Sequence, residues 1–527
     1  MVKVIFAHQI HPVEPLGIGY LTSSIARGGH ETNLVLTPPN IEDALELVSK
    51  EVEKHKPDVF AQSIIFGSHG YAIELNRRVL SKHPNLISIL GGPAATFTPI
   101  IMDRGFDAIC RYEGEYPFLE FCNALENKQD VGNIPNIWVR PSPDKYKTEI
   151  KKLKENTDEN TPGYAHESGF DDKNIRFVNN TRNLLDGEVL DSLPFPDRDI
   201  LYAHNIFADS PIKHGMLTRG CAFHCTYCHV EMQNIENKGK GKAVRMRSFE
   251  SLAEEIKMTK ELCKKKNMPF KLFYLQDDIF GPAYKLEWAE KFADVASREM
   301  NIPMHAHVRF DLIAKDERIA RALARAGVSG VHIAIEAGDE RNRNEVHRRG
   351  MTDYEIFTGA KYLRKYGIKM MTQNILGAVG ETRETMIKTL DMNIAVKPTF
   401  ASASIFQPFP GTSSLEKARD TGVLPTADIN KLIDIFSEST FYNHSILVND
   451  PAERRWMEVF QKFFAIAVEK PILYGSGELN KMMDPYLKDP SKDLTELEGR
   501  YREHRNKKDE ELYGVRFKDF VGVIKED

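Results

Sequence analysis

The chain has 527 residues, with 71 Lys and Arg, 76 Asp and Glu and a net charge of −5, so it lacks the basic excess of proteins that bind a nucleic-acid backbone. Its 41% hydrophobic and 28% charged residues indicate a globular protein with more than one core. No apolar run reaches the ~18 to 20 residues of a membrane span. The first residues, with Lys3 and Gln9, are typical of a strand and not of a signal peptide, and six cysteines are too few for a disulfide framework. We expect a cytoplasmic protein.

Residues 1–140 alternate between strand and helix patterns. Apolar runs predict five strands, Val2–His8, Thr32–Leu36, Asp58–Phe66, Leu86–Leu90 and Asp107–Arg111. Helical patterns lie between and after them, as at Gly17–Arg27 and Ile41–Lys54. This order predicts an α/β domain with a doubly wound parallel sheet, in which ligands bind beyond the carboxyl ends of the strands.

Residues 141–205 are predicted to form a linker or insertion. Their first part, to about Lys173, is polar and charged with few apolar anchors, which is typical of a solvated segment. The sequence Leu193-Pro-Phe-Pro-Asp197 then leads into the next region.

Residues 206–425 again alternate. The predicted strands are Gly215–Thr218, Leu272–Leu275, Met304–Arg309, Gly330–Ile335, Lys369–Leu376 and Ala401–Gln407. With helices such as Phe249–Lys264 and Asp316–Ala326 between them, they predict a (β/α)6 partial TIM barrel whose chemistry takes place at the strand carboxyl ends. Residues 426–527 are predicted to form a mainly helical domain, which includes the apolar helix Trp456–Val468.

The most specific motif is Cys221-Ala-Phe-His-Cys225-Thr-Tyr-Cys228-His229, directly after the first predicted barrel strand. The other three cysteines, Cys110, Cys122 and Cys263, fall in a buried strand pattern or on apolar helix faces. Because free cysteine behaves as a small hydrophobic residue, these three are interpreted as core residues.

Four interpretations of the cysteine motif compete, and chance clustering is one of them. The C-x-x-C-H part matches a c-type haem attachment, but that chemistry follows export, and no export signal is expected. A structural zinc would need His224 or His229 as a fourth ligand, without the usual second C-x-x-C half. An iron–sulfur cubane held by three thiolates would leave one iron open to an outside ligand, which suits catalysis at a barrel mouth.

The C-x3-C-x2-C spacing after the first strand of such a barrel resembles the radical S-adenosylmethionine superfamily, over about residues 215–412. The resemblance implies a 4Fe–4S cluster held by Cys221, Cys225 and Cys228, with S-adenosylmethionine bound to the open iron. In that family the reduced cluster breaks a C–S bond and gives a 5′-deoxyadenosyl radical. The resemblance further implies that Tyr227 packs near the adenine and that an electron donor such as flavodoxin or ferredoxin is a partner.

Other segments match the same family in order. Gln276-Asp277-Asp278 ends the second strand, where the family holds the methionine amino group, although the usual Gly-Gly-Glu is absent. Glu336 ends the fourth strand, where a carboxylate commonly binds the ribose hydroxyls. Gly377 and Gly380 lie in a turn that resembles the adenine-binding turn after the fifth strand, and Pro408–Thr412 resembles a motif after the sixth. Taken singly, the aspartates could cap a helix, and Gly380 could form an ordinary turn.

The N-terminal region resembles the cobalamin-binding domain of one large subfamily. The shared features are Gly91-Gly92-Pro93, Glu113-Gly114-Glu115 and the 193–197 linker, and Ser63 at the end of the third strand belongs to the same expected site. Paired glycines would let the backbone approach a flat macrocycle closely. The alternative is a flavodoxin-like domain that binds a nucleotide or no ligand. A dinucleotide fingerprint is rejected, because Thr22 replaces the third glycine of G-x-G-x-x-G.

Many cobalamin domains carry D-x-H-x-x-G after the first strand, with the histidine as the lower cobalt ligand. Here the segment is Gln9-Ile-His11 followed by Glu14 in place of the glycine. We therefore interpret His11 as a polar loop residue and expect a lower cobalt face without a histidine, as is usual in this subfamily.

The resemblance implies methyl transfer to an unactivated carbon or phosphorus centre of a small molecule, such as a lipid or natural-product precursor. The runner-up is a cobalamin-dependent oxidative cyclase or rearrangement enzyme, like the anaerobic porphyrin ring cyclase. The non-enzyme alternative is a corrinoid or iron–sulfur carrier, which would not cleave S-adenosylmethionine.

Overall fold

The computed structural model describes residues 1–140, 144–147, 176–177, 182–281, 285–438, 444–447 and 450–514. Most of the linker predicted from residue 141 to about 173 lies outside these residues. The chain divides into two compact units. Unit 1 consists of Met1–Phe207, Met232–Lys242 and Thr426–Glu438, and unit 2 consists of Ala208–Glu231, Ala243–Pro425 and Ser439–Asp527. The finer division into four parts stays a prediction.

Unit 1 is built on one sheet with the strand order β2-β1-β3-β4-β5-β6-β7. Its strands are β1 (Lys3–Gln9), β2 (Glu31–Thr37), β3 (Val59–Ser63), β4 (Ile87–Gly91), β5 (Ala108–Cys110), β6 (Ile137–Val139) and β7 (Arg176–Phe177). The first five pair in parallel, as predicted, and β6 and β7 add an antiparallel edge. The edge strands have three and two residues, too few to give a sequence pattern.

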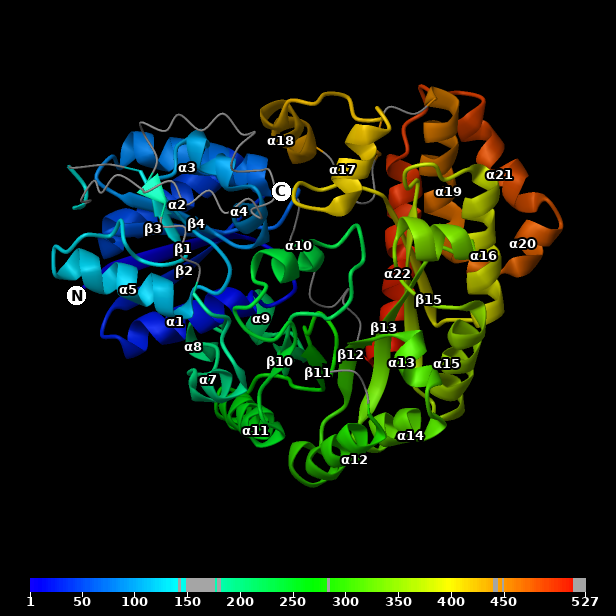
Figure 1. Ribbon diagram of the computed structural model, residues 1–527, viewed down its shortest axis with the longest axis horizontal. Coiled ribbons are helices and arrows are strands. Elements are labelled where there is room, and N and C mark those ends of the chain that lie inside the picture. The colour runs from blue at the N-terminus through cyan, green and yellow to red at the C-terminus, as the bar shows by residue number, and fades with distance from the viewer. Residues whose placement is uncertain are drawn as a thin grey trace. The chain divides into compact units, whose positions relative to one another are not determined.

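Helices cover both faces of this sheet (Figure 1). Those of unit 1 are α1 (Leu16–Arg27), α2 (Ile41–His55), α3 (His69–Lys82), α4 (Pro93–Phe97), α5 (Glu115–Glu126), α7 (Gly187–Ser192), α8 (Arg198–Leu201) and α18 (Ile429–Glu438). The short α9 (Asn205–Ala208) ends at the boundary between the units. Asn40 starts α2 by accepting hydrogen bonds from the amides of Glu42 and Asp43, so that the helix buries Val48 and Val52 against the sheet.

Unit 2 contains six parallel strands in the order β15-β14-β13-β12-β11-β8, the predicted partial barrel. They are β8 (Ile212–Gly215), β11 (Leu272–Leu275), β12 (Met304–Val308), β13 (Val328–Glu336), β14 (Lys369–Leu376) and β15 (Phe400–Ile405). The prediction of the first strand at Gly215–Thr218 was wrong. The strand ends at Gly215, and its polar residues, Lys213 and His214, are buried. The two-residue strands β9 (Thr218–Arg219) and β10 (Arg245–Met246) then pair with each other in the antiparallel direction.

The helices of unit 2 surround these strands. They are α10 (His229–Glu236, which continues into unit 1), α11 (Phe249–Lys265), α12 (Leu286–Val295), α13 (Phe310–Ala314), α14 (Glu317–Arg325), α15 (Asp353–Lys365), α16 (Arg383–Val396), α17 (Ser413–Asp420), α19 (Pro451–Glu469), α20 (Pro471–Gly475), α21 (Glu478–Leu487) and α22 (Thr495–Tyr513). The apolar helix predicted at Trp456–Val468 is the buried part of α19, which packs on β15 and α16. The C-terminal region is helical, as predicted.

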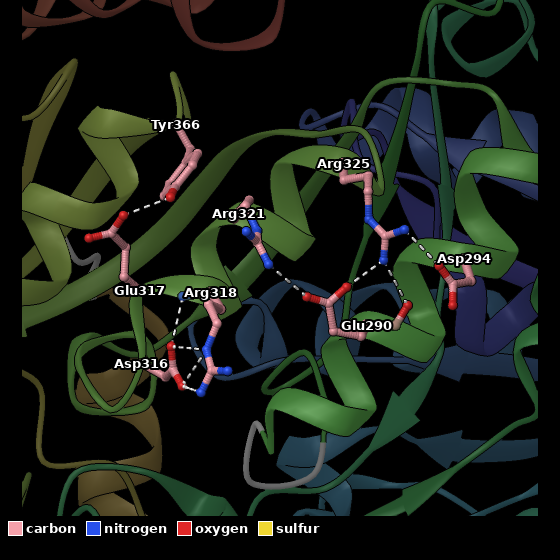
Figure 2. Close-up of polar contacts among 8 residues, drawn as sticks. All are labelled: Glu290, Asp294, Asp316, Glu317, Arg318, Arg321, Arg325 and Tyr366. Atoms are coloured by element: carbon pink, nitrogen blue, oxygen red, sulfur yellow. Dashed lines mark hydrogen bonds and ion pairs between the residues drawn. The ribbon is translucent and has the colours of Figure 1, made fainter.

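Ion pairs join the outer helices of the barrel (Figure 2). Arg325 of α14 contacts Glu290 and Asp294 of α12 at 2.5 and 2.7 Å. Tyr366, just after α15, donates a 2.7 Å hydrogen bond to Glu317 of α14. Such exposed pairs contribute about 0–1 kcal/mol each. Arg325 and Tyr366 each lie three residues before a barrel strand, β13 (Val328–Glu336) or β14 (Lys369–Leu376), so these contacts are not at the carboxyl ends of those strands.

The C-terminal helix α22 packs against the inner face of the barrel sheet. Its Tyr501, Leu512 and Tyr513 form one buried cluster with side chains of four strands. Those side chains are Ile212, Leu272, Met371 and Phe400. The helix therefore fills part of the lumen of the incomplete barrel. No helix in the described part of the chain combines the length and the apolar character that a membrane crossing requires.

Candidate active site

The cysteine loop begins at a glycine that no other residue could replace without strain. Gly220 has a φ of 81°, and a Cβ there would lie 2.1 Å from the carbonyl oxygen of Ala243. Cys221, Cys225 and Cys228 follow; Cys225 is buried and the other two are half-buried. Burial and, to a smaller extent, the neighbouring thiol of Cys225 raise the pKa of Cys221. The three thiols therefore lie near one another on one loop.

The donor set fits an iron–sulfur cluster. Three thiols on a short loop match cluster ligation, and Nη1 of Arg349 lies 3.5 Å from Sγ of Cys225, where its charge would stabilise a thiolate. In the described residues, no three His, Cys, Asp or Glu side chains converge in the geometry of a metal site, these thiols included. The loop thus supplies the right kind of ligands, and their binding of a cluster stays a prediction.

The two aspartates at the end of β11 hold the start of the cysteine loop. Oδ1 of Asp277 accepts hydrogen bonds from the amides of Leu217 (2.7 Å) and Thr218 (2.9 Å). Oδ2 of Asp278 accepts one from the amide of Gly220 at 3.0 Å. Asp277 is fully buried, and burial raises its pKa to about 7. These contacts make the aspartates positioning residues for the loop; a contact with the methionine amino group stays a prediction, as it does for Gln276.

Tyr227 and Glu336 meet at the carboxyl end of the barrel. The Tyr227 hydroxyl donates a 2.6 Å hydrogen bond to Oε1 of Glu336, and Nη1 of Arg349 lies 3.2 Å from the same hydroxyl. Glu336 ends β13 with a φ of 66°, a conformation that a non-glycine residue rarely adopts, next to a register shift in the pairing with β14. Burial raises the pKa of Glu336, although Arg349 and the Tyr227 hydrogen bond oppose that shift.

A cavity of about 290 Å³ opens beside this pair, within unit 2. Tyr227 and Glu336 line it at one side, together with side chains near the carboxyl ends of β14 and β15. His332 of β13 and Arg505 of α22 line it as well. A buried carboxylate and a phenol in the wall of a cavity with both polar and apolar side chains suit a ligand with vicinal hydroxyls and an aromatic base, such as a nucleoside.

The turn after β14 depends on Glu381, a residue that was not among the predicted site residues. Oε2 of Glu381 accepts hydrogen bonds from the amides of Gly377 (2.6 Å) and Ala378 (3.1 Å). Gly377 and Gly380 have φ of 83° and 82°, and a Cβ on Gly377 would lie 2.2 Å from Sδ of Met457. The glycines are thus required by the turn itself, and their contact with adenine stays a prediction.

The segment after β15 lies against the cysteine loop. The amide of Ser414 donates to the carbonyl of Thr226 at 3.0 Å, and the hydroxyl of Ser413 donates to Glu231 at 2.7 Å. Thr412, the last residue of the predicted Pro408–Thr412 motif, caps α17. The motif therefore supports the loop from the opposite edge of the sheet.

In unit 1 the paired glycines fit close packing of two loops. Gly92 has a φ of 90°, and a Cβ there would lie 2.5 Å from the carbonyl oxygen of Ile64 and 3.0 Å from Oγ of Ser63. Gly91 meets only ordinary contacts, and Pro93 begins α4. Ile65, beside Ser63 at the carboxyl end of β3, has 62% of its surface exposed. An exposed apolar side chain at this edge suits the face of a flat macrocycle.

The Glu113–Glu115 segment faces the linker and α5. Oε2 of Glu113 accepts a 2.8 Å hydrogen bond from the amide of Leu185. Gly114 leaves space for Leu21, since a Cβ there would lie 3.0 Å from its Cδ2, and Glu115 is buried in the first turn of α5. Glu113 therefore joins the loop after β5 to the segment around Leu185, and Glu115 belongs to α5. A contact of these residues with cobalamin stays a prediction.

The altered histidine motif has a structural counterpart. Glu14, which stands where the glycine of D-x-H-x-x-G would be, is 1% exposed and forms an ion pair with Arg198 of α8. Nδ1 of His11 accepts a hydrogen bond from the amide of Val13 at 3.2 Å, within its own exposed loop. The loop is therefore attached to the segment after the 193–197 linker by a buried ion pair.

Arg349 was not among the site residues predicted from the sequence either, because a single arginine in a polar loop forms no recognisable sequence motif. Glu381 carried a signal, since an acidic residue directly after a Gly-x-x-Gly turn can accept hydrogen bonds from the turn amides. Deletion of the Arg349 side chain would affect Tyr227, which lines the cavity, and deletion of the Glu381 side chain would affect the turn after β14.

Comparison with known proteins agrees with this geometry. A family model described as the Radical SAM superfamily matches residues 216–392, and one described as a B12 binding domain matches residues 2–121. An uncharacterized methyltransferase of Pyrococcus horikoshii is 24% identical over 427 residues, which are 80% of this chain and 82% of the relative. The anaerobic magnesium-protoporphyrin IX monomethyl ester cyclase of Rubrivivax gelatinosus is 22% identical over 416 residues, 77% of this chain and 66% of the relative.

Among solved structures, the radical S-adenosylmethionine methyltransferase TsrM of Kitasatospora setae, with cobalamin and a 4Fe–4S cluster bound, has a similar fold. It superposes with a TM-score of 0.59 at 16% identity over 81% of this chain and 80% of that one. The B12 model matches the first part of unit 1 and the Radical SAM model lies mainly in unit 2, and the resemblance expected from the motifs is confirmed. The chain belongs to the cobalamin-binding radical S-adenosylmethionine enzymes, whose cofactors are a 4Fe–4S cluster, S-adenosylmethionine and cobalamin.

Proposed function

We propose that this enzyme transfers a methyl group to an unactivated carbon or phosphorus centre of a small molecule. The observation that carries the proposal is the arrangement of unit 2, where Tyr227 of the three-cysteine loop and Glu336 line one cavity, in a chain that also has a B12 domain. The similarity to a Pyrococcus methyltransferase over most of both chains supports methyl transfer in particular.

In this proposal Cys221, Cys225 and Cys228 hold the cluster. Glu336, oriented by Tyr227, accepts hydrogen bonds from the ribose, while Tyr227 also borders the adenine. Gln276, Asp277 and Asp278 approach the methionine end, and the turn from Gly377 to Gly380 borders the base.

The cobalamin contacts are assigned to unit 1. They are Ser63, Gly91, Gly92, Pro93, Glu113, Gly114 and Glu115, all at the carboxyl edge of the parallel strands. When bound, the three cofactors together supply a hydrogen-abstracting radical and a methyl donor.

This chain's own residues bind and orient these groups. The Asp277 and Asp278 hydrogen bonds fix the start of the cysteine loop, and Ser413 and Ser414 fix its far end. Arg349 contributes positive charge beside Cys225, and its Nη2 donates to the carbonyl of Ala334 at 3.2 Å, which links the loop to β13. A one-electron donor such as a flavodoxin or ferredoxin in the cytosol would complete the system.

The second candidate is oxidative cyclisation, favoured by the similarity to the Rubrivivax cyclase. The two are separated by incubating the reduced, cofactor-loaded protein with S-adenosylmethionine and a cell extract. Methyl transfer releases S-adenosylhomocysteine and 5′-deoxyadenosine in equal amounts. Its product is heavier than the substrate by the mass of one CH2 group. Cyclisation releases 5′-deoxyadenosine alone. A protein that releases neither would be a carrier and would contradict both candidates.

A further inference from the structure

A polar cluster fills the barrel lumen next to the cavity. The Tyr274 hydroxyl lies 2.7 Å from Nε2 of His307 and 3.0 Å from Nδ1 of His332, and Nε2 of His305 lies 2.8 Å from the same Nδ1. The ring of His305 stacks on that of Tyr274, and the ring of Tyr513 of α22 lies against both, with its centroid 4.9 Å from that of His305 and 6.3 Å from that of Tyr274. These groups hold His332 in one orientation at the wall of the cavity.

The imidazoles of this cluster are neutral at neutral pH. Burial lowers the pKa of His307 to about 4 and places those of His305 and His332 well below the usual value. The positive charge of the lumen therefore comes from a group that does not titrate. Arg505 of α22 is that group, and its charge further lowers the pKa of His332.

The cavity has one negatively charged and one positively charged side chain among its described lining residues. Among the described lining residues, Glu336 is the one carboxylate and Arg505 the one guanidinium. Glu336 already accepts from Tyr227. The remaining polar side chains of the lining are neutral hydrogen-bonding groups, His332 among them, and alternate residues of β15 place Ser402 and Ser404 on the same face of the strand.

We propose that Arg505, with His332, Ser402 and Ser404, binds an anionic oxygen group of the methyl acceptor, a carboxylate or a phosphate. We call these four residues the anion floor. The proposal rests on the proposed function, because it assigns the acceptor to the same cavity. It also gives the C-terminal helix a role, since α22 carries the cation into the lumen.

The chemistry of the set favours an oxyanion over a neutral group. A guanidinium presents five N–H donors in a planar fork that matches two oxygens of a carboxylate or phosphate. Asp509 lies one turn further along α22 and interacts with the positive charge of Arg505. Burial raises the pKa of Asp509 to about 6, although that charge opposes the shift. Five donors allow one guanidinium to serve a helix neighbour and a ligand together.

The test measures anion binding by the cluster-loaded protein with saturating S-adenosylmethionine. Inorganic phosphate, followed by the width of its phosphorus resonance, and acetate, followed by saturation transfer, represent the two sources. We expect at least one probe to bind the native protein. Arg505→Gln should weaken that binding roughly tenfold or more, and Arg505→Lys, which keeps the charge without the fork, should weaken it less. Arg502→Gln, an exposed site one turn from Glu498 on the same helix, is the matched control and should bind as the native protein does.

The probe that Arg505→Gln loses identifies the group as phosphate or carboxylate. The proposal is wrong if neither probe binds the native protein at saturating S-adenosylmethionine, or if Arg505→Gln binds the probe as tightly as the native protein does. Binding of a probe only when S-adenosylmethionine is left out would also contradict it, because the anion floor would then belong to that cofactor. Folding of each variant is checked by circular dichroism, and Arg505→Lys keeps the test decisive if Arg505→Gln does not fold. Binding and cleavage of S-adenosylmethionine by the native protein are measured separately, so a failure of the proposed function would be seen there.

Discussion

The Tyr227 hydroxyl and Oε1 of Glu336 are 2.6 Å apart, although 109 residues separate them in the chain. The bond joins the cysteine loop to the end of β13, where Glu336 holds a left-handed backbone conformation. Strain of this kind persists where the surrounding contacts demand it, and it is typical of functional sites. The pair therefore aims a buried carboxylate into the cavity beside the proposed cluster.

Glu336→Gln should weaken the binding of S-adenosylmethionine about tenfold or more. A carboxylate that accepts from two hydroxyls makes charge-assisted hydrogen bonds worth very roughly 1.5–3 kcal/mol, which a neutral amide does not replace. Equilibrium dialysis of the cluster-loaded protein measures the affinity. Glu340→Gln, at an exposed site after the same strand, is the control. Unchanged affinity with a lower melting temperature would assign Glu336 a structural role alone.

Asp277→Ala should destabilise unit 2 and lower the iron content after reconstitution. Two buried amides, those of Leu217 and Thr218, would lose their acceptor, at a cost of about 1–3 kcal/mol each. Asp277→Asn keeps an oxygen acceptor and should recover most of both properties. Thermal unfolding and iron analysis provide the readouts, and an alanine variant with full stability and iron would contradict the anchoring role.

Glu381 should make stability depend on pH. Burial raises its pKa from 4.5 to about 7 in the folded protein, so between these values the folded state retains a proton that the unfolded state has lost. The contribution of this group to stability therefore falls as pH rises from about 4.5 to 7 and stays constant above. Glu381→Gln, whose amide oxygen can still accept from the turn, should show a smaller drop in melting temperature between pH 5 and pH 8.

Glu384→Gln, three residues further at an exposed site, serves as the control and should keep the native pH profile. An identical pH dependence in native protein and Glu381→Gln would mean that Glu381 is ionised across the whole range.

The predicted bounds of β11 and β14 match the structure, because β11 is a continuous apolar run and β14 carries apolar pairs near both ends. The predicted position of the first barrel strand was wrong because β8 carries two polar residues, Lys213 and His214. Lys213 can be buried there because its ammonium group donates a hydrogen bond to the carbonyl of Ala208 at 3.0 Å. Motif spacing located the cysteine loop and Glu336. It could not find Arg349 or Arg505, because their roles come from contacts between distant segments.

Bound cob(II)alamin should have no axial protein nitrogen. A strong lower imidazole favours heterolytic transfer of a methyl cation, whereas radical methylation needs homolysis, and here His11 accepts from Val13 in its own loop. Its paramagnetic resonance spectrum should lack threefold nitrogen splitting and should be unchanged in His11→Ala. Splitting that disappears in His11→Ala would make His11 the ligand, and splitting that persists would indicate another nitrogen.

The central claim is that Cys221, Cys225 and Cys228 hold a cluster that cleaves S-adenosylmethionine, and iron analysis combined with product counting tests it most directly. Anaerobically reconstituted protein should contain about four iron and four sulfide per chain and release 5′-deoxyadenosine when reduced. Replacing any of the three cysteines by alanine should abolish that release, while Cys263→Ala, in the buried face of α11, should retain it. Zinc without iron, or cleavage that survives loss of one of the three cysteines, would contradict the account.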